Sequence, residues 1–223
     1  MVPREHPPLD FRRLYDHFDA PIAAFDCGQK CAPHNPSGKP FCCDICQAVP
    51  AAYRPEWEYL RRSTDLWHVW RGDECAASPE NPAGLLAETP DTMLLLACQG
   101  PERCQRPYRA LSCRQFPFFP YITSDGIFIG LAYEWDYEAT CWVIVHPEVV
   151  TDAYREEFVR TYDGLFESWP EIYESYAWQS EDMRLHHLAR SRRIPLLHRN
   201  GRSYLLSPGS ERLRRTRFPT SGA

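Results

Sequence analysis

The sequence predicts an α+β protein in which a small cysteine-rich core with short strands and a hairpin precedes C-terminal amphipathic helices. Three observations support this fold class. Ten cysteines are present, and five of them fall within residues 27–46. Short apolar runs between turn residues indicate strands in residues 92–145, and aromatic residues at helical spacing indicate helices in residues 148–190. We expect two parts, residues 1–146 and 147–223.

The composition narrows the class of protein. The 223 residues are 43 % hydrophobic, which is enough for a real core. A net charge of −5 argues against nucleic acid or an anionic membrane as a partner. Met1 to Asp10 lack the apolar region of a signal peptide, and no apolar run approaches a membrane helix of about 20 residues. These features predict a cytoplasmic protein. The basic tail is expected to be a solvated terminus; its arginines are Arg212, Arg214, Arg215 and Arg217.

The first half of the chain contains weaker secondary-structure signals than the second. Phe11, Leu14, Tyr15 and Phe18 follow a 3–4 spacing and predict a short helix. Residues 54–62 predict another, with Pro55 in the first turn and acidic residues ahead of basic ones. Residues 71–92 are expected to form a loop because glycine and proline are frequent there.

Strand signals come next. Residues 92–98 predict a buried strand or a short helix. Residues 116–123 and 127–133 flank Ser124-Asp125-Gly126 and predict a hairpin, and residues 141–145 are a third strand candidate.

The C-terminal part is predicted to contain two helices and a hairpin. Aromatic residues recur every three or four positions through residues 148–167, which favours an amphipathic helix. A second helix is expected over residues 171–190. Residues 194–197 and 203–206 flank Asn200-Gly201 and predict the hairpin.

The cysteine spacing indicates a metal site, because clustered thiols in a reducing compartment are more often metal ligands or catalytic groups than disulfides. Cys43-x2-Cys46 is a spacing that lets two sulfurs reach one ion, and Cys27-x3-Cys31 allows the same on a helical turn. Thiolates this close together repel one another unless a cation neutralises them. We therefore expect the core to be metal-centred.

Soft thiolate ligands select zinc, iron–sulfur clusters or cuprous ion. A structural zinc site and a [4Fe–4S] cluster each need four ligands, so eight cysteines can fill two sites. We favour an iron–sulfur cluster, of the [4Fe–4S] type, ahead of zinc. The expected ligands are Cys27, Cys31, Cys42, Cys43, Cys98, Cys104, Cys113 and Cys141.

Cys75 stands alone in a loop and is not expected to be a ligand. Three other residues near these ligands are open to more than one interpretation. Cys46 is well spaced for a ligand but less well supported. His34 can replace one sulfur or be a solvated loop residue. Arg114 follows Cys113 and is the candidate cofactor-binding residue, because a guanidinium can offset thiolate charge; a surface salt bridge is the alternative.

Two motif classes are excluded. The C-x3-C-x2-C pattern of enzymes that cleave S-adenosylmethionine fails, because His34 stands where its third cysteine would be. Neither G-x-G-x-x-G nor G-x-x-x-x-G-K-[ST] occurs, so these nucleotide-binding loops have no support.

The order of the motifs resembles the YkgJ-type cysteine cluster family, whose members are described as zinc- or iron-chelating CxxCxxCC proteins. The similarity covers residues 25–145. It rests on Cys27, Cys31, Cys42-Cys43, Cys98, Cys104, Tyr108, Cys113-Arg114-Gln115-Phe116-Pro117 and Cys141. The chain departs from the family pattern in the x3 spacing of the first pair and in the ten residues before Cys42.

The resemblance implies a metal-binding protein whose centre is structural or carries electrons. Flagellin lysine N-methylases have a similar cysteine pattern, and they imply an alternative, a protein-modifying enzyme with the cluster as cofactor or scaffold. A metal chaperone or store and a disulfide-stapled secreted protein are two further alternatives. The expected partner is a metal ion or cluster, with no nucleic acid and no membrane.

Overall fold

The computed structural model describes residues 9–75 and 81–218, which form a mixture of helices and antiparallel strands and confirm the α+β class. These residues divide into two compact units. We call residues 9–19 and 26–116 the cysteine unit, and residues 20–25 and 117–218 the C-terminal unit. The division after Phe116 differs from the expected one after residue 146, because the predicted hairpin pairs with strands from the end of the chain.

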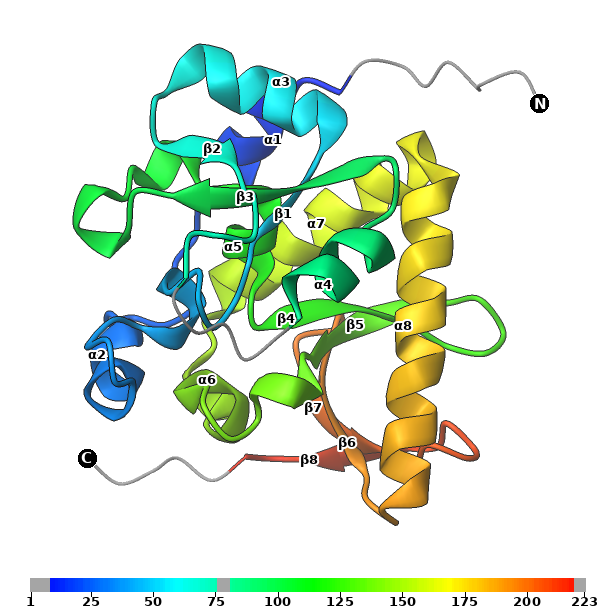
Figure 1. The fold of residues 1–223 in the computed structure, drawn as a ribbon. Helices are drawn as coiled ribbons and strands as arrows, with labels where there is room; N and C mark the ends of the chain where they lie inside the picture. The colour runs from blue at the N-terminus through cyan, green and yellow to red at the C-terminus, as the bar shows by residue number, and fades with distance from the viewer. Residues whose placement is uncertain (1–8, 76–80, 219–223) are drawn as a thin grey trace. The chain divides into compact units, whose positions relative to one another are not determined.

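A three-stranded sheet forms the centre of the cysteine unit (Figure 1). The central strand β3 (Met93–Cys98) pairs antiparallel with β1 (Ala51–Tyr53) through its first half and with β2 (Trp67–Val69) through its second half. Leu95, Leu96 and Ala97 are buried, so residues 92–98 form a strand rather than the alternative helix.

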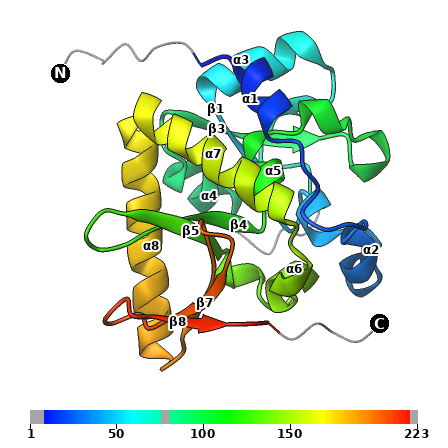
Figure 2. The same ribbon diagram turned by 180° about the vertical axis from the view of Figure 1, so that it is seen from behind.

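Two predicted helices are confirmed in this unit. Helix α1 (Phe11–His17) begins after Asp10, whose carboxylate accepts a hydrogen bond from the backbone N–H of Arg13. Figure 2 shows α1 beside α3 (Arg54–Ser63), which begins with Pro55 in its first turn. Glu56 lies in the first turn of α3, as the helix dipole favours, and it is buried with 1 % of its surface exposed.

The expected loop over residues 71–92 is partly wrong. Helix α4 (Pro82–Glu88) begins after Asn81, whose side chain accepts from the N–H of Ala83. Pro82, one of the prolines that suggested a loop, therefore stands at the start of a capped helix. Residues 76–80 of this segment lie outside the described residues.

Short helical turns connect the remaining parts of the cysteine unit. They are α2 (Gly28–Cys31), η1 (Ala32–His34), η2 (Phe41–Cys43), η3 (Pro101–Arg103), η4 (Arg106–Tyr108) and α5 (Leu111–Gln115). Proline lies in the first turn of η1, η3 and η4, as its fixed φ favours.

A five-stranded antiparallel sheet forms the C-terminal unit. Its order is β4 (Phe118–Ile122), β5 (Phe128–Tyr133), β6 (Ile194–His198), β7 (Ser203–Leu206) and β8 (Leu213–Thr216). Both predicted hairpins are therefore confirmed, while β8 was missed. Gly130 has φ +154°, and a Cβ atom there would lie 2.3 Å from the carbonyl oxygen of Leu197, so close pairing of β5 with β6 requires glycine.

Two long helices accompany this sheet, and both were predicted. Helix α7 (Asp152–Ser168) begins after Thr151, which caps the N–H of Tyr154, and α8 (Pro170–Ala189) runs alongside β4 (Figure 1). The buried hydroxyl of Ser180 on α8 accepts from the N–H of Ile122 at 2.9 Å. This hydrogen bond satisfies the last backbone donor of β4 and fixes the helix on the strand.

The strand predicted over residues 141–145 is wrong. This segment forms α6 (Trp142–Val145), between the turns η5 (Trp135–Tyr137) and η6 (Pro147–Val149). Cys141 donates its N–H to the carbonyl of Tyr137, which starts a helical turn before the β-branched residues begin. Among residues 9–75 and 81–218, no helix is long and apolar enough to cross a bilayer.

Candidate thiol site

Seven of the eight expected ligands belong to the cysteine unit, where short elements present them. Cys27 and Cys31 bracket α2, Cys42 and Cys43 lie in η2, and Cys98 ends β3. Cys104 follows η3 and Cys113 lies within α5. The eighth, Cys141, precedes α6 in the C-terminal unit. All eight are free cysteines.

The loop that holds the first cysteines is organised by Asp44. Its carboxylate accepts from the Ser37 hydroxyl at 2.6 Å, from the Asn35 amide at 3.0 Å and from the N–H of Cys46 at 3.0 Å. Burial raises the pKa of Asp44, but these hydrogen bonds and the charge of Lys39 outweigh it, so the pKa lies below its usual value. The sequence suggested that this polar loop needs a cross-link or a metal, and Asp44 supplies part of that order.

A disulfide supplies the rest, because Cys46 is bonded to Cys75. The pair links the end of the first cysteine segment to a residue 29 positions further along the chain. A sulfur in a disulfide is not a thiolate, so the open interpretation of Cys46 as a ligand is wrong. The expectation that Cys75 is not a ligand agrees with this bond.

Cys42 and Cys43 lie side by side, although an extended backbone would have pointed them apart. The 3₁₀ turn η2 places their sulfurs 3.9 Å from each other. A hydrogen bond from Cys42 lowers the pKa of Cys43 to about 7; burial opposes the shift and the charge of Arg109 supports it. Cys43 is therefore partly a thiolate near neutral pH.

The cation beside these sulfurs is Arg109, a residue that the sequence interpretation missed. Its Nε donates to the sulfur of Cys104 at 3.0 Å. Burial would lower the pKa of Arg109, but the hydrogen bond to Cys104 and the charges of Cys104, Cys43 and Cys113 raise it. Arg109 lies between η4 and α5 rather than within a helix, so no helical spacing in the sequence indicated its contact with Cys104.

The thiols also lie within electrostatic range of one another. Burial raises the pKa of Cys113, and the charges of Cys98, Cys43 and Cys104 raise it further. Burial likewise raises the pKa of Cys98, with contributions from Cys43 and Cys104. Burial and the charge of Cys31 raise the pKa of Cys27 to about 11. The fold thus gathers sulfurs from segments far apart in the sequence into one region.

Arg114, the expected cofactor-binding residue, makes a different set of contacts. Its Nε and two terminal nitrogens donate to five backbone carbonyls, those of Tyr15, Phe18, Arg106, Pro107 and Arg109. The guanidinium also lies 4.3 Å from the ring centroid of Tyr15. These contacts make Arg114 a clamp between α1 and the loop that carries Cys104.

The gathered sulfurs do not form a ready-made coordination shell. Within residues 9–75 and 81–218, no three cysteine, histidine, aspartate or glutamate side chains lie close enough together to hold one metal ion. His34, the alternative ligand, is exposed on η1. Side-chain rotation of the cysteines would be needed before four sulfurs could share one centre.

Comparison of the chain with models of known protein families, with curated proteins and with solved structures found no match.

Proposed function

We propose that the cysteine unit binds a thiolate-liganded metal centre, an iron–sulfur cluster ahead of zinc, in a structural or electron-transfer role. The observation that supports it best is the hydrogen bond from Arg109 to Cys104 within a group of interacting thiols. A half-buried cation beside several sulfurs lowers the energetic penalty of deprotonating them, which metal binding requires.

The thiols of the cysteine unit offer more sulfurs than one centre needs. We place Cys43, Cys98, Cys104 and Cys113 in the centre, because their charges act on one another. The charges of Cys43, Cys104 and Cys113 also act on Arg109. Cys27, Cys31 and Cys42 are the alternative ligands: each can replace one of these four cysteines or bind a second metal centre. Such a centre would cross-link three loop segments, and an iron–sulfur cluster would also carry electrons. The YkgJ-type resemblance is consistent with this assignment.

The test is the metal content of protein purified without oxygen. Iron, zinc and sulfide are quantified on one sample together with its absorption spectrum. Iron and sulfide near stoichiometry with a broad band at roughly 400 nm would support a cluster. Zinc alone would support a structural site. Full-length folded protein without bound metal would refute the proposal.

Two matched arginine variants test the site itself. Arg109→Met is expected to lower metal occupancy, because it removes the cation beside Cys104. Arg103→Met is the control: its side chain lies in the same loop but donates to Gln99 rather than to sulfur. Equal metal occupancy in both variants would exclude the role given to Arg109.

A further inference from the structure

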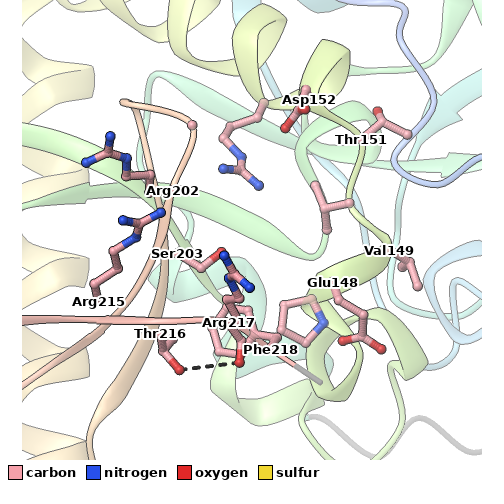
Figure 3. A pocket seen from close by; sticks show the side chains of 14 residues that line it. Glu148, Val149, Thr151, Asp152, Arg202, Ser203, Arg215, Thr216, Arg217 and Phe218 are labelled. Atoms are coloured by element: carbon pink, nitrogen blue, oxygen red, sulfur yellow. Dashed lines mark hydrogen bonds between the residues drawn. The ribbon is translucent and has the colours of Figure 1, made fainter. Parts of the chain in front are cut away.

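The C-terminal unit contains a cavity of about 570 Å³. Its wall combines the segment that leads into α7, the turn between β6 and β7, and the end of β8 (Figure 3). This volume is typical of small-molecule sites in proteins. No residue of the cavity belongs to the cysteine unit, so it requires a separate interpretation.

Arg155 on α7 lines this cavity and is buried, with 7 % of its surface exposed. Its Nε and one terminal nitrogen have no hydrogen-bond partner in the part of the chain that the structure describes. Burial lowers the pKa of Arg155, although the charge of Asp152 opposes the shift. A buried guanidinium with unsatisfied donors is costly, and an anion in the cavity would remove that cost.

The other buried arginine of the described chain shows how unusual this is. Arg114 is equally buried, and backbone carbonyls engage its Nε and both of its terminal nitrogens. Within the described residues, burial alone therefore does not leave the N–H donors of an arginine without hydrogen-bond partners. Arg155, two of whose nitrogens lack partners in the described chain, lies at the wall of a cavity, where a ligand can reach its guanidinium group.

Three further arginines surround the same cavity. Arg202 lies in the turn before β7, Arg215 lies on β8, and Arg217 follows β8. Figure 3 shows Arg202 and Arg215 near each other and Arg217 beside Phe218. Arg215 and Arg217 belong to the tail that was expected to be a solvated terminus. The strand β8 adds Arg215 to the sheet, and the side chains of Arg215 and Arg217 are exposed, as expected of a solvated tail.

Two carboxylates also line the cavity and limit which anion it can take. Glu148 interacts with the Nδ1 atom of His146 at 3.1 Å, while Asp152 lies near Arg155 and opposes an incoming anion. A ligand with a single carboxylate would bind weakly there, because the charge of Asp152 offsets much of its attraction to Arg155. A phosphate group carries more charge and more acceptor oxygens, and it matches the fork of a guanidinium.

We propose that this cavity binds a small molecule through its phosphate group, with Arg155 contacting the phosphate and Arg202, Arg215 and Arg217 facing the same anion. The assignment is independent of the metal proposed for the cysteine unit. The rim arginines are exposed and supply attraction, whereas the buried Arg155 supplies most of the binding contacts.

The test is calorimetric titration of the full-length protein with inorganic phosphate, with pyrophosphate and acetate in parallel. Phosphate and pyrophosphate are expected to bind and acetate is not. Arg155→Gln should weaken phosphate binding by about tenfold or more, because hydrogen bonds to charged groups are strong. Arg160→Gln is the matched control, since Arg160 is exposed on the same helix and does not line the cavity.

The result that overturns the inference is the absence of phosphate binding, or binding that Arg155→Gln leaves unchanged. Should Arg155→Gln fail to fold, the exposed pair Arg215→Gln and Arg217→Gln decides. That double variant should weaken phosphate binding and make it less sensitive to salt. Phosphate binding unaffected by the double variant would equally exclude the site.

Discussion

Replacement of Arg114 by methionine is the sharpest test of how the cysteine unit is held together. The change keeps most of the side-chain length and removes all donors to the five backbone carbonyls. Tyr15 and Phe18 are buried, so their carbonyl oxygens cannot easily recruit water in its place. The carbonyls of Arg106 and Pro107 belong to exposed residues, and water can replace their bonds.

The expected magnitude follows from the two buried acceptors. An unsatisfied buried group costs about 1–3 kcal/mol, and a partly desolvated cation–π contact with Tyr15 contributes about 1 kcal/mol. We therefore expect Arg114→Met to reduce the free energy of unfolding of the cysteine unit by about 3–7 kcal/mol. Arg114→Lys should recover little, because an ammonium group cannot reproduce the planar fork.

The assay is urea unfolding combined with hydrogen exchange. The chain has two compact units, so a single fluorescence transition need not report the cysteine unit alone. Hydrogen exchange should show lost protection in α1 and in residues 104–110. Arg62→Met is the control, because Arg62 pairs only with the exposed Glu58 on the surface of α3. A loss below about 1 kcal/mol for Arg114→Met would refute the clamp.

Three further changes have defined outcomes. Reduction of the Cys46–Cys75 disulfide, or replacement of both cysteines by serine, should lower the free energy of unfolding by about 3.5 kcal/mol, because the two residues are 29 positions apart. Thiol titration of the unreduced, denatured chain should find eight free thiols. Burial raises the pKa of the Glu134 carboxyl to about 7, so its contribution to the free energy of unfolding is full below pH 4.5 and is lost as the pH rises through 7. Glu134→Gln should reduce this loss of stability by about 1–2 kcal/mol, measured by urea titrations at pH 5 and pH 7.5. Gly130→Ala should cost about 3 kcal/mol or more in thermal unfolding, and a cost near zero would show that β5 and β6 separate easily.

The long elements could be predicted because their signals are local. Aromatic residues at helical spacing identified α7 and α8, and turn residues between apolar runs identified both hairpins. The error at residues 141–145 has the same origin, since Val143, Ile144 and Val145 favour strands wherever a partner strand exists. Their helical turn is decided by Tyr137 and Cys141, which bond to each other outside the apolar run.

The site could be predicted only in part, because the folded chain determines which groups its arginines contact. Cysteine spacing identified the segments that carry the thiols, but the spacing contains no information about which arginine reaches them. Arg114 is next to Cys113 in sequence, yet helix α5 turns it toward the carbonyls of α1. Arg109 reaches Cys104 because η4 and α5 fold the loop back on itself. Proximity in sequence therefore did not indicate that Arg109 is the arginine that hydrogen-bonds to a cysteine sulfur.

Metal removal offers a prediction about how the cysteine unit is built. Small metal domains unfold when their metal is removed, because little else holds them. Here Asp44, the Cys46–Cys75 disulfide and Arg114 also hold the loops that would carry the proposed metal. A chelator should therefore reduce hydrogen-exchange protection near residues 98–113 and leave strands β1 and β3 protected.

The control for that experiment is a chelator added to the Cys46→Ser and Cys75→Ser double variant. Without the disulfide, the loops depend more on the metal, so the same treatment should expose β1 and β3 as well. Complete unfolding of the unaltered protein on metal removal would mean that the metal, rather than the three protein contacts, determines the stability of this unit. In that case the clamp assigned to Arg114 would be secondary to the metal centre in stabilising this unit.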